Sequence, residues 1–307
     1  MPRATTHPRA PWTITGLAAL CGVALAVAVA VAPGASGAAT SSPRVDPMPG
    51  SPASGLTVES PTETTADVST GAPENTTVYP LESLPQIDVW SVDAALPIDD
   101  DPFGELTGEL ARPRAAAPVF ADPAGEPIGY LAHDAAYGGS VVPVVVHDTY
   151  WVKVLLSGRQ GLPPSGSSAQ AVGWLRIADV DLSPVESYVE VHLEARTIDI
   201  VSATGLERVA SDFAWGKPST PTPVGRTFVM LTTVVPEYAY TQGHPLVYLG
   251  VQSPTLPGFD GGEVAVTAFH FYRERSGPNS FGCIYLDGPA TDRLAQLPAG
   301  TPVIIHP

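Results

Sequence analysis

The chain has 307 residues, which allows two compact domains and a tail, and only 15% of its residues are charged. Its 34 prolines and 29 glycines interrupt long helices, so we expect a mainly β protein of short strands joined by turns. The formal net charge is −16. Because the sequence holds no clustered basic segment that would neutralise phosphates, this charge excludes nucleic acid as a partner.

The first 39 residues have the pattern of an export signal. Arg3 and Arg9 precede an apolar stretch over residues 14–32, and small residues follow up to Ala39. The apolar stretch is long for a cleaved signal peptide and nearly long enough to cross a bilayer, so a signal peptide and a membrane anchor both stay open. Either one predicts that the rest of the chain lies outside the cytoplasm, and an anchor would hold it at the membrane.

Residues 40–112 are rich in Pro, Ser, Thr and acidic residues, with 13 acids and two bases. Such a segment has too few large apolar side chains to fold alone, so we expect a disordered, flexible spacer. The acidic run at residues 99–101 lacks the ligand spacing of a calcium loop and is typical of a solvated linker.

The composition changes at Pro113, where apolar runs begin, and this change marks the start of the first predicted domain, residues 113–183. Apolar runs between turn residues predict strands at residues 118–120, 128–131, 141–146, 150–156 and 173–176. Their order, with the runs at residues 151–154 and 173–175, resembles a bacterial SH3-like barrel. Trp151 and Trp174 fit the aromatic core of such a barrel better than a ligand groove.

The second predicted domain, residues 184–307, is also β-rich. Alternating apolar and polar residues predict a hairpin over residues 189–201. Further strands are expected at residues 227–231, 245–249, 264–269 and 302–305, with a short helix at residues 289–296. The stretch at residues 218–225 has too many prolines for a sheet interior, so we expect a rim loop there.

His270 and Cys283, which a glycine-flanked loop separates, form the candidate catalytic pair. A cysteine acts as a nucleophile only as the thiolate, and a nearby imidazole produces that form near neutral pH. Gly282 lets the backbone approach a substrate closely, so amides there can donate to an oxyanion. The pattern predicts a thiol acyl-transfer site, although spacing alone fits a buried cysteine beside a core histidine equally well. No metal site is expected, because the other histidines lack ligand spacing.

Residues 185–305 resemble the L,D-transpeptidase (YkuD-like) catalytic domain. The resemblance is carried by the hairpin at residues 189–193, by Gly216-Lys217 with residues 220–225, by His270, by Ser280-Phe281-Gly282-Cys283 and by the end at residues 299–305. It implies a YkuD-like β-sandwich catalytic domain with a short helix, preceded here by the SH3-like domain.

The chain departs from the family's pattern beside the candidate nucleophile. Phe281 stands where the family usually has a second histidine, and Tyr285 stands where it usually has an arginine. Phe271 and Tyr272 replace a glycine and a small residue after His270. Losing the arginine removes a fixed cation that would orient a carboxylate, so Tyr285, Phe281 and Tyr272 are candidate substrate-binding residues.

The resemblance implies that Cys283 attacks the carbonyl of the third stem residue of a peptidoglycan tetrapeptide and forms a thioester acyl-enzyme. His270 acts as general base and acid, and an amine on a neighbouring stem completes a 3→3 cross-link. The backbone at Gly282 contributes to an oxyanion hole, Ser280 shapes the loop, and the backbone carbonyl of Phe271 orients His270. The implied partners are peptidoglycan stem peptides and, as inhibitors, β-lactams of the carbapenem class. No cofactor is implied.

Two alternatives stay open. With water as the acceptor, the same site would be an L,D-carboxypeptidase. A non-catalytic peptidoglycan-binding protein with a degenerate transpeptidase domain is the alternative from another class. The presence of Cys283 and His270 argues against that alternative, whereas Phe281 and Tyr285 favour it.

Overall fold

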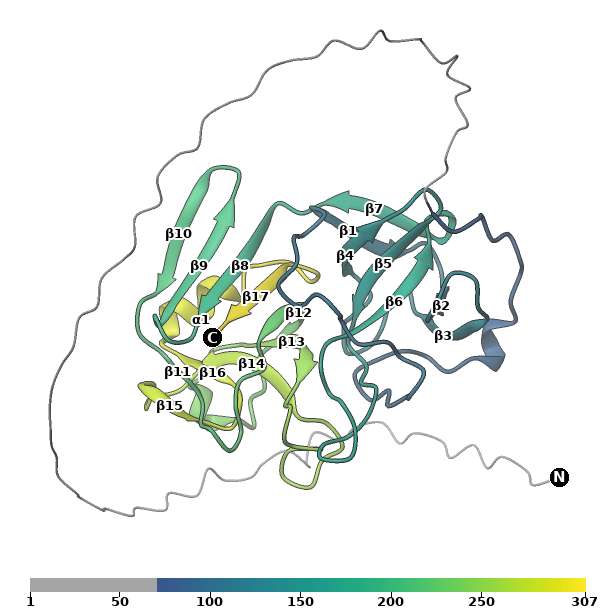
Figure 1. The fold of residues 1–307 in the computed structure, drawn as a ribbon. Helices are drawn as coiled ribbons and strands as arrows, with labels where there is room; N and C mark the ends of the chain where they lie inside the picture. Colours follow the sequence, from purple (N-terminus) through teal and green to yellow (C-terminus); the bar gives the residue numbers. More distant parts are fainter. Residues whose placement is uncertain (1–70) are drawn as a thin grey trace, which may run out of the picture. The chain divides into compact units, whose positions relative to one another are not determined.

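The computed structural model describes residues 71–307, which are mainly β and form two sheets (Figure 1). The first sheet has seven strands in the order β3-β2-β6-β5-β4-β1-β7. Its strands are β1 (Glu109–Pro113), β2 (Ala117–Phe120), β3 (Pro127–Leu131), β4 (Val142–His147), β5 (Trp151–Leu156), β6 (Ala171–Arg176) and β7 (Val180–Pro184).

The second sheet has ten strands in the order β10-β9-β8-β17-β12-β13-β14-β16-β11-β15. They are β8 (Ser187–His192), β9 (Thr197–Ser202), β10 (Gly205–Ala210), β11 (Ala214–Gly216), β12 (Gly225–Thr233), β13 (Leu246–Gln252), β14 (Val266–Phe271), β15 (Gly277–Ser280), β16 (Ile284–Leu286) and β17 (Pro302–His306). The helix α1 (Gly288–Leu294) and the 3-10 turns η2 (Leu81–Ser83), η3 (Ile177–Asp179) and η4 (Ala239–Thr241) complete the described elements.

Local sequence explains the elements that lead to the site. In β8, Val189 and Val191 alternate with polar residues and are fully buried, because successive side chains of a strand point to opposite faces. Asp287 caps the start of the helix α1, because its carboxylate accepts a hydrogen bond from the amide of Ala290. Its buried Leu294 packs with the apolar residues of the second sheet.

The strands expected in residues 118–176 are confirmed by β2 to β6, and those expected in residues 227–305 by β12, β13, β14 and β17. The predicted hairpin is the antiparallel pair of β8 and β9, and the predicted helix is α1. Trp151 is fully buried, as expected of a core residue, whereas Trp174 is half-buried. The likeness of residues 113–183 to an SH3-like barrel stays a prediction, since β1 and β7 extend the sheet to seven strands.

Apolar residues gather in two clusters, and the first of these draws on both sheets. It contains the inward residues of the seven-stranded sheet and also Phe228 and Met230 of β12, which belongs to the ten-stranded sheet. The second cluster lies within the ten-stranded sheet and α1. The shared cluster means that burial of apolar surface, the main stabilising term in folding, links the two sheets.

The flexible spacer predicted up to residue 112 differs from the structure over residues 72–112. Ile87, Val89 and Leu96 are buried in the first cluster. The backbone is also paired, since the amide of Ile87 donates to the carbonyl of Tyr130 at 2.8 Å. A few well-spaced apolar residues are therefore enough to pack this segment into the first cluster. The export segment at residues 1–39 and the spacer up to residue 70 lie outside the described residues.

The acidic run predicted to be solvated includes one buried ion pair. The carboxylate of Asp99 accepts two hydrogen bonds from the guanidinium of Arg226, at 2.7 Å from Nε and 2.8 Å from Nη2. Both side chains are at most 5% exposed. A bidentate pair of this kind compensates for the loss of hydration of both charges. It fastens the segment before β1 to β12.

Within residues 71–307, no helix has the length and apolar character needed to cross a membrane.

Candidate active site

The parallel pairing of β14 and β16 brings the two candidate catalytic residues together. His270 lies on β14 opposite Tyr285 of β16, and Cys283 directly precedes β16. Residues paired across neighbouring strands share a face, so Tyr285 lies on the side of the sheet that carries His270. Tyr240 meets both groups: its ring centroid lies 5.5 Å from that of His270, and the charge of Cys283 contributes to raising the pKa of Tyr240.

The thiol of Cys283 is partly exposed, whereas His270 is 5% exposed. The sulfur lies 4.0 Å from the backbone carbonyl of Val266 at the start of β14. A substrate can therefore approach the sulfur from solvent, while the protein shields the imidazole.

Ser280 holds the backbone of the loop before Cys283 in shape. Its hydroxyl accepts a hydrogen bond from the amide of Gly282 at 3.1 Å and donates to the carbonyl of Cys283 at 2.5 Å. Ser280 is fully buried, and Gly282 has φ +114°, a conformation that other residues rarely adopt. The Gly282 amide, which we expected to face an oxyanion, is thus already engaged by Ser280.

The proline-rich loop at residues 218–225 clamps this turn from the other side. Thr222 Oγ1 donates to the carbonyl of Gly282 at 2.9 Å, and Thr220 Oγ1 donates to the carbonyl of Ser280 at 3.2 Å. Thr222 Oγ1 also accepts from the amide of Gly216 at 2.8 Å. A side chain at Gly216 would collide with Thr222, since an added Cβ would lie 2.3 Å from its amide nitrogen. The predicted rim loop therefore supports the nucleophile.

His270 is held as a neutral base. Its Nδ1 lies 3.0 Å from the carbonyl oxygen of Phe271, which can only accept, so Nδ1 carries the proton and Nε2 is the basic nitrogen. Burial lowers the pKa of His270 from its ordinary 6.5 to about 4. The imidazole consequently stays in its base form at neutral pH.

Tyrosines that the sequence analysis did not single out surround the pair. Burial raises the pKa values of Tyr238, Tyr240 and Tyr248, that of Tyr238 to about 12, and the charges of neighbouring groups, Cys283 among them, add to the rise. All three phenols therefore stay protonated at neutral pH. The only sequence signal was the repeated tyrosine at residues 238 and 240, before η4 and within it.

The three candidate substrate-binding residues take two different positions. Tyr285 is 6% exposed, and its ring centroid lies 4.8 Å from that of His270 and 4.6 Å from that of Tyr272. Phe281 is 41% exposed, and the ammonium of Lys217 sits 3.8 Å from the centre of its ring. Tyr272 and Tyr285 thus enclose the imidazole, whereas Phe281 and Lys217 form an outer rim.

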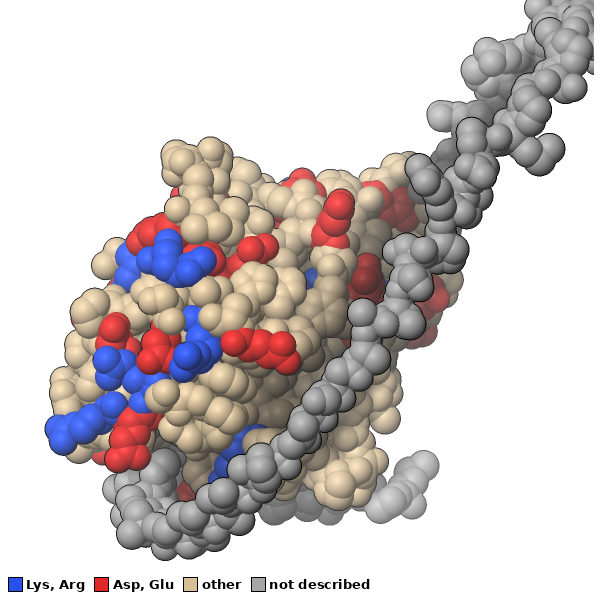
Figure 2. Space-filling model, turned by 60° about the vertical axis from the view of Figure 1, so that its left-hand side comes forward, with Lys and Arg blue, Asp and Glu red and all other residues tan. Residues whose placement is uncertain are grey.

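The surface around the loop that joins β14 to β15 carries both acidic and basic side chains. A hollow of about 600 Å³ there is lined by Asp212, Arg273, Glu274 and Arg275, among others. Figure 2 shows that basic and acidic side chains intermingle on this side of the molecule. Within residues 71–307, no group of three or more His, Cys, Asp or Glu residues is placed to hold a metal ion.

Comparison with known proteins gives structural similarities only. No family model matches the chain, and no curated protein matches it. Among solved structures, the catalytic domain of an Enterococcus faecium L,D-transpeptidase shares 22% identity, with a TM-score of 0.27, over 39% of this chain and 97% of that domain. An L,D-transpeptidase from Mycobacterium smegmatis shares 15% identity, with a TM-score of 0.31, over 52% of this chain and 91% of that protein.

A third similar structure is that of the L,D-transpeptidase LdtMt1 in complex with imipenem. It shares 14% identity, with a TM-score of 0.30, over 54% of this chain and 90% of that protein.

Proposed function

We propose that this protein is a peptidoglycan L,D-transpeptidase that forms 3→3 cross-links through a thioester on Cys283. The observation that carries the proposal is a neutral, oriented imidazole on β14 beside the paired strand β16, which the partly exposed Cys283 directly precedes. The clamped turn before the thiol adds the rigid backbone that acyl transfer requires. Export by residues 1–39 would place this activity in the cell wall or at the outer face of the membrane.

In the first half-reaction, the thiol of Cys283 gives its proton to Nε2 of His270. The thiolate attacks the carbonyl carbon of the third stem residue, and the tetrahedral intermediate expels the terminal D-alanine as its amine. His270 returns the proton to that amine, so a thioester is formed and one amino acid is released.

In the second half-reaction, the side-chain amine of a diamino acid on a neighbouring stem attacks the thioester carbonyl. His270 takes a proton from this amine and passes it to the sulfur as the carbon–sulfur bond breaks. The products are an amide cross-link and the original thiol. A histidine whose pKa lies near 4 is a weak base towards the thiol and the amine, but its protonated form gives the proton back readily to the leaving amine and to the sulfur.

The engaged Gly282 amide bears on how the oxyanion is stabilised. Since Ser280 already accepts from this amide, the intermediate needs another donor or a rotation of the turn. The hydroxyl of Tyr240 is a candidate donor, because its raised pKa keeps it protonated beside Cys283. If neither donor is available, the protein would be the non-catalytic wall-binding alternative.

Acylation by a carbapenem tests the proposal directly. The full-length chain is incubated with imipenem, and its intact mass is compared with those of Cys283→Ala and Cys21→Ala. We expect one adduct on the wild type and on Cys21→Ala, and none on Cys283→Ala. A folded wild-type chain without an adduct would contradict the enzymatic function. Muropeptide analysis with defined acceptors then separates transpeptidase from L,D-carboxypeptidase activity.

A further inference from the structure

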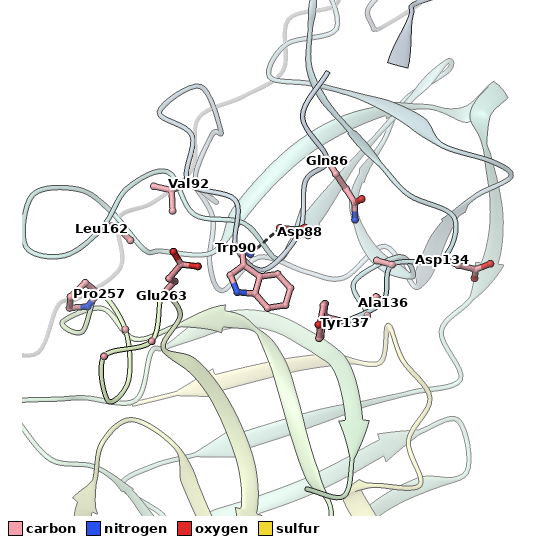
Figure 3. A pocket seen from close by; sticks show the side chains of 15 residues that line it. Gln86, Asp88, Trp90, Val92, Asp134, Ala136, Tyr137, Leu162, Pro257 and Glu263 are labelled. Atoms are coloured by element: carbon pink, nitrogen blue, oxygen red, sulfur yellow. Dashed lines mark hydrogen bonds between the residues drawn. The ribbon is translucent and has the colours of Figure 1, made fainter. Parts of the chain in front are cut away.

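A second cavity, of about 1070 Å³, is lined by none of the candidate catalytic residues. Its lining includes Gln86, Asp88, Trp90, Tyr137, Leu162 and Glu263. Figure 3 shows these side chains around one opening, with residues 86–92 on one side and Pro257 and Glu263 on another. The cavity therefore lies between the segment before β1 and the loop that joins β13 to β14.

Two aromatic rings form the centre of the cavity (Figure 3). The ring centroids of Trp90 and Tyr137 are 4.3 Å apart, with the planes at 73°. Tyr137 is 37% exposed, and Trp90 packs partly against the first apolar cluster. Aromatic rings of this kind offer a broad apolar face at low entropic cost, because they have only two side-chain torsions.

One buried residue fixes both walls of the cavity. The guanidinium of Arg159 donates to the carbonyls of Pro257 at 3.0 Å and Glu263 at 2.8 Å, which are the two ends of one wall. The backbone of Arg159 pairs with the other wall, since its amide donates to Ser91 and its carbonyl accepts from Asp93. Arg159 is 1% exposed, so these bonds are shielded from water.

Gln252 adds a second tie between the walls. Its side-chain amide donates to the carbonyl of Val89 at 2.8 Å, and its side-chain oxygen accepts from the amide of Ala265 at 3.1 Å. Gln252 is 1% exposed. A cavity held by buried bonds on both sides is preorganised, which reduces the entropy lost when a ligand binds.

The lining selects the chemistry of the ligand. It contains three carboxylates, those of Asp88, Asp134 and Glu263, and no lysine, arginine or histidine, so it disfavours an anionic ligand. Arg112, which does not line the cavity, pairs with Asp134 at 2.7 Å, so Asp88 and Glu263 supply most of the negative charge. The carboxylates and the amide of Gln86 match the hydroxyl and acetamido groups of a sugar in hydrogen bonding. The volume slightly exceeds the usual range for small-molecule sites, about 300–1,000 Å³, which favours an oligomer.

We infer that this cavity binds an uncharged oligosaccharide of N-acetylated amino sugars. Trp90 and Tyr137 stack against the apolar faces of the pyranose rings, and the polar side chains hold the hydroxyl and acetamido groups. This inference rests on the proposed function in one respect: the oligosaccharide is identified with the glycan strand whose peptide stems reach Cys283.

The chain connects this cavity directly with the candidate active site. Glu263 in the cavity wall is followed three residues later by Val266, the first residue of β14. The carbonyl of Val266 contacts the sulfur of Cys283, and the same strand carries His270. The loop in the cavity wall therefore leads directly into the strand that carries His270 and contacts Cys283.

Binding of the β-1,4-linked hexamer of N-acetylglucosamine tests the inference. Titration calorimetry on the full-length chain should give saturable binding. Tyr137→Ala should weaken it at least tenfold, because the exposed half of the aromatic floor is lost. The control Tyr150→Ala removes an equally exposed tyrosine that does not line the cavity and should leave binding unchanged. Arg159→Met, a positioning variant, should weaken binding too, and binding should recover partly in Arg159→Lys.

The failure of this inference and that of the proposed function give different results. Cys283→Ala should bind the hexamer like the wild type, whether or not the wild type forms an adduct with imipenem. No binding by a folded wild-type chain overturns the inference. Equal binding by Tyr137→Ala and the wild type also overturns it. Salt-dependent binding of a lysine-rich peptide, with no binding of the sugar, would assign the cavity to a cationic ligand instead.

Discussion

Replacing His270 by glutamine should remove a pH-dependent part of the free energy of unfolding. In the folded chain burial lowers the pKa of His270 to about 4, whereas an unfolded histidine keeps its ordinary value of 6.5. Between these values the unfolded chain binds a proton that the folded chain does not bind. Stability is therefore full above pH 6.5 and is lost as the pH falls towards 4.

The size of this effect follows from the two pKa values. At pH 4.5 the protonated histidine favours the unfolded chain by roughly 2 to 3 kcal/mol relative to pH 7.5, and at pH 5.5 by about half as much. Urea denaturation followed by tryptophan fluorescence gives the free energy of unfolding at two pH values. The effect of His270 is the change between the two pH values in the wild type minus the same change in His270→Gln. The subtraction removes other titrating groups. If the two proteins lost stability in parallel on acidification, the buried neutral imidazole would be refuted.

Three further variants test the packing around the site. Asp99→Asn leaves the buried guanidinium of Arg226 without its counter-charge and should lower the free energy of unfolding by about 3–5 kcal/mol in urea denaturation. Ser280→Ala leaves the amide of Gly282 and the carbonyl of Cys283 without their hydrogen-bond partner. Acylation by imipenem should therefore slow, and the free energy of unfolding should fall by about 1–3 kcal/mol. Unchanged acylation would show that the turn keeps its shape without Ser280. Gly282→Ala forces a side chain into φ +114° and should destabilise the turn by about 1–3 kcal/mol, visible as a lower thermal midpoint and slower acylation.

The helices and strands that were predicted best from the sequence are those whose apolar residues form a continuous run or a regular pattern. The strands β5 and β13 are examples, and so is the helix α1, whose start is marked by Asp287 and Pro289. The strands β1, β7 and β10 were missed. Also missed were the short strands β11, β15 and β16, which contain three or four residues each. Their pairing depends on neighbours far along the chain, and no local period reveals it.

Parts of the candidate site were beyond prediction for a similar reason. The sequence singled out His270, Cys283 and the Phe271 carbonyl because they adjoin a recognisable motif. The contribution of Thr220 and Thr222 is visible only once β11 lies beside β15, so that their hydroxyls reach the nucleophile turn. The segment before β1 was misjudged because its composition resembles that of a disordered linker.

The first apolar cluster, which Phe228 and Met230 share with residues 87–96, limits how this protein can be rearranged during evolution. A recombination event that cut the gene near Pro113 or Pro184 would separate side chains that shield one another from water. Each fragment would then expose apolar surface and lose the counter-charge of Asp99 or Arg226. We therefore expect the two sheets to be inherited together rather than exchanged as modules, with changes accumulating instead in exposed turns such as the one between β9 and β10.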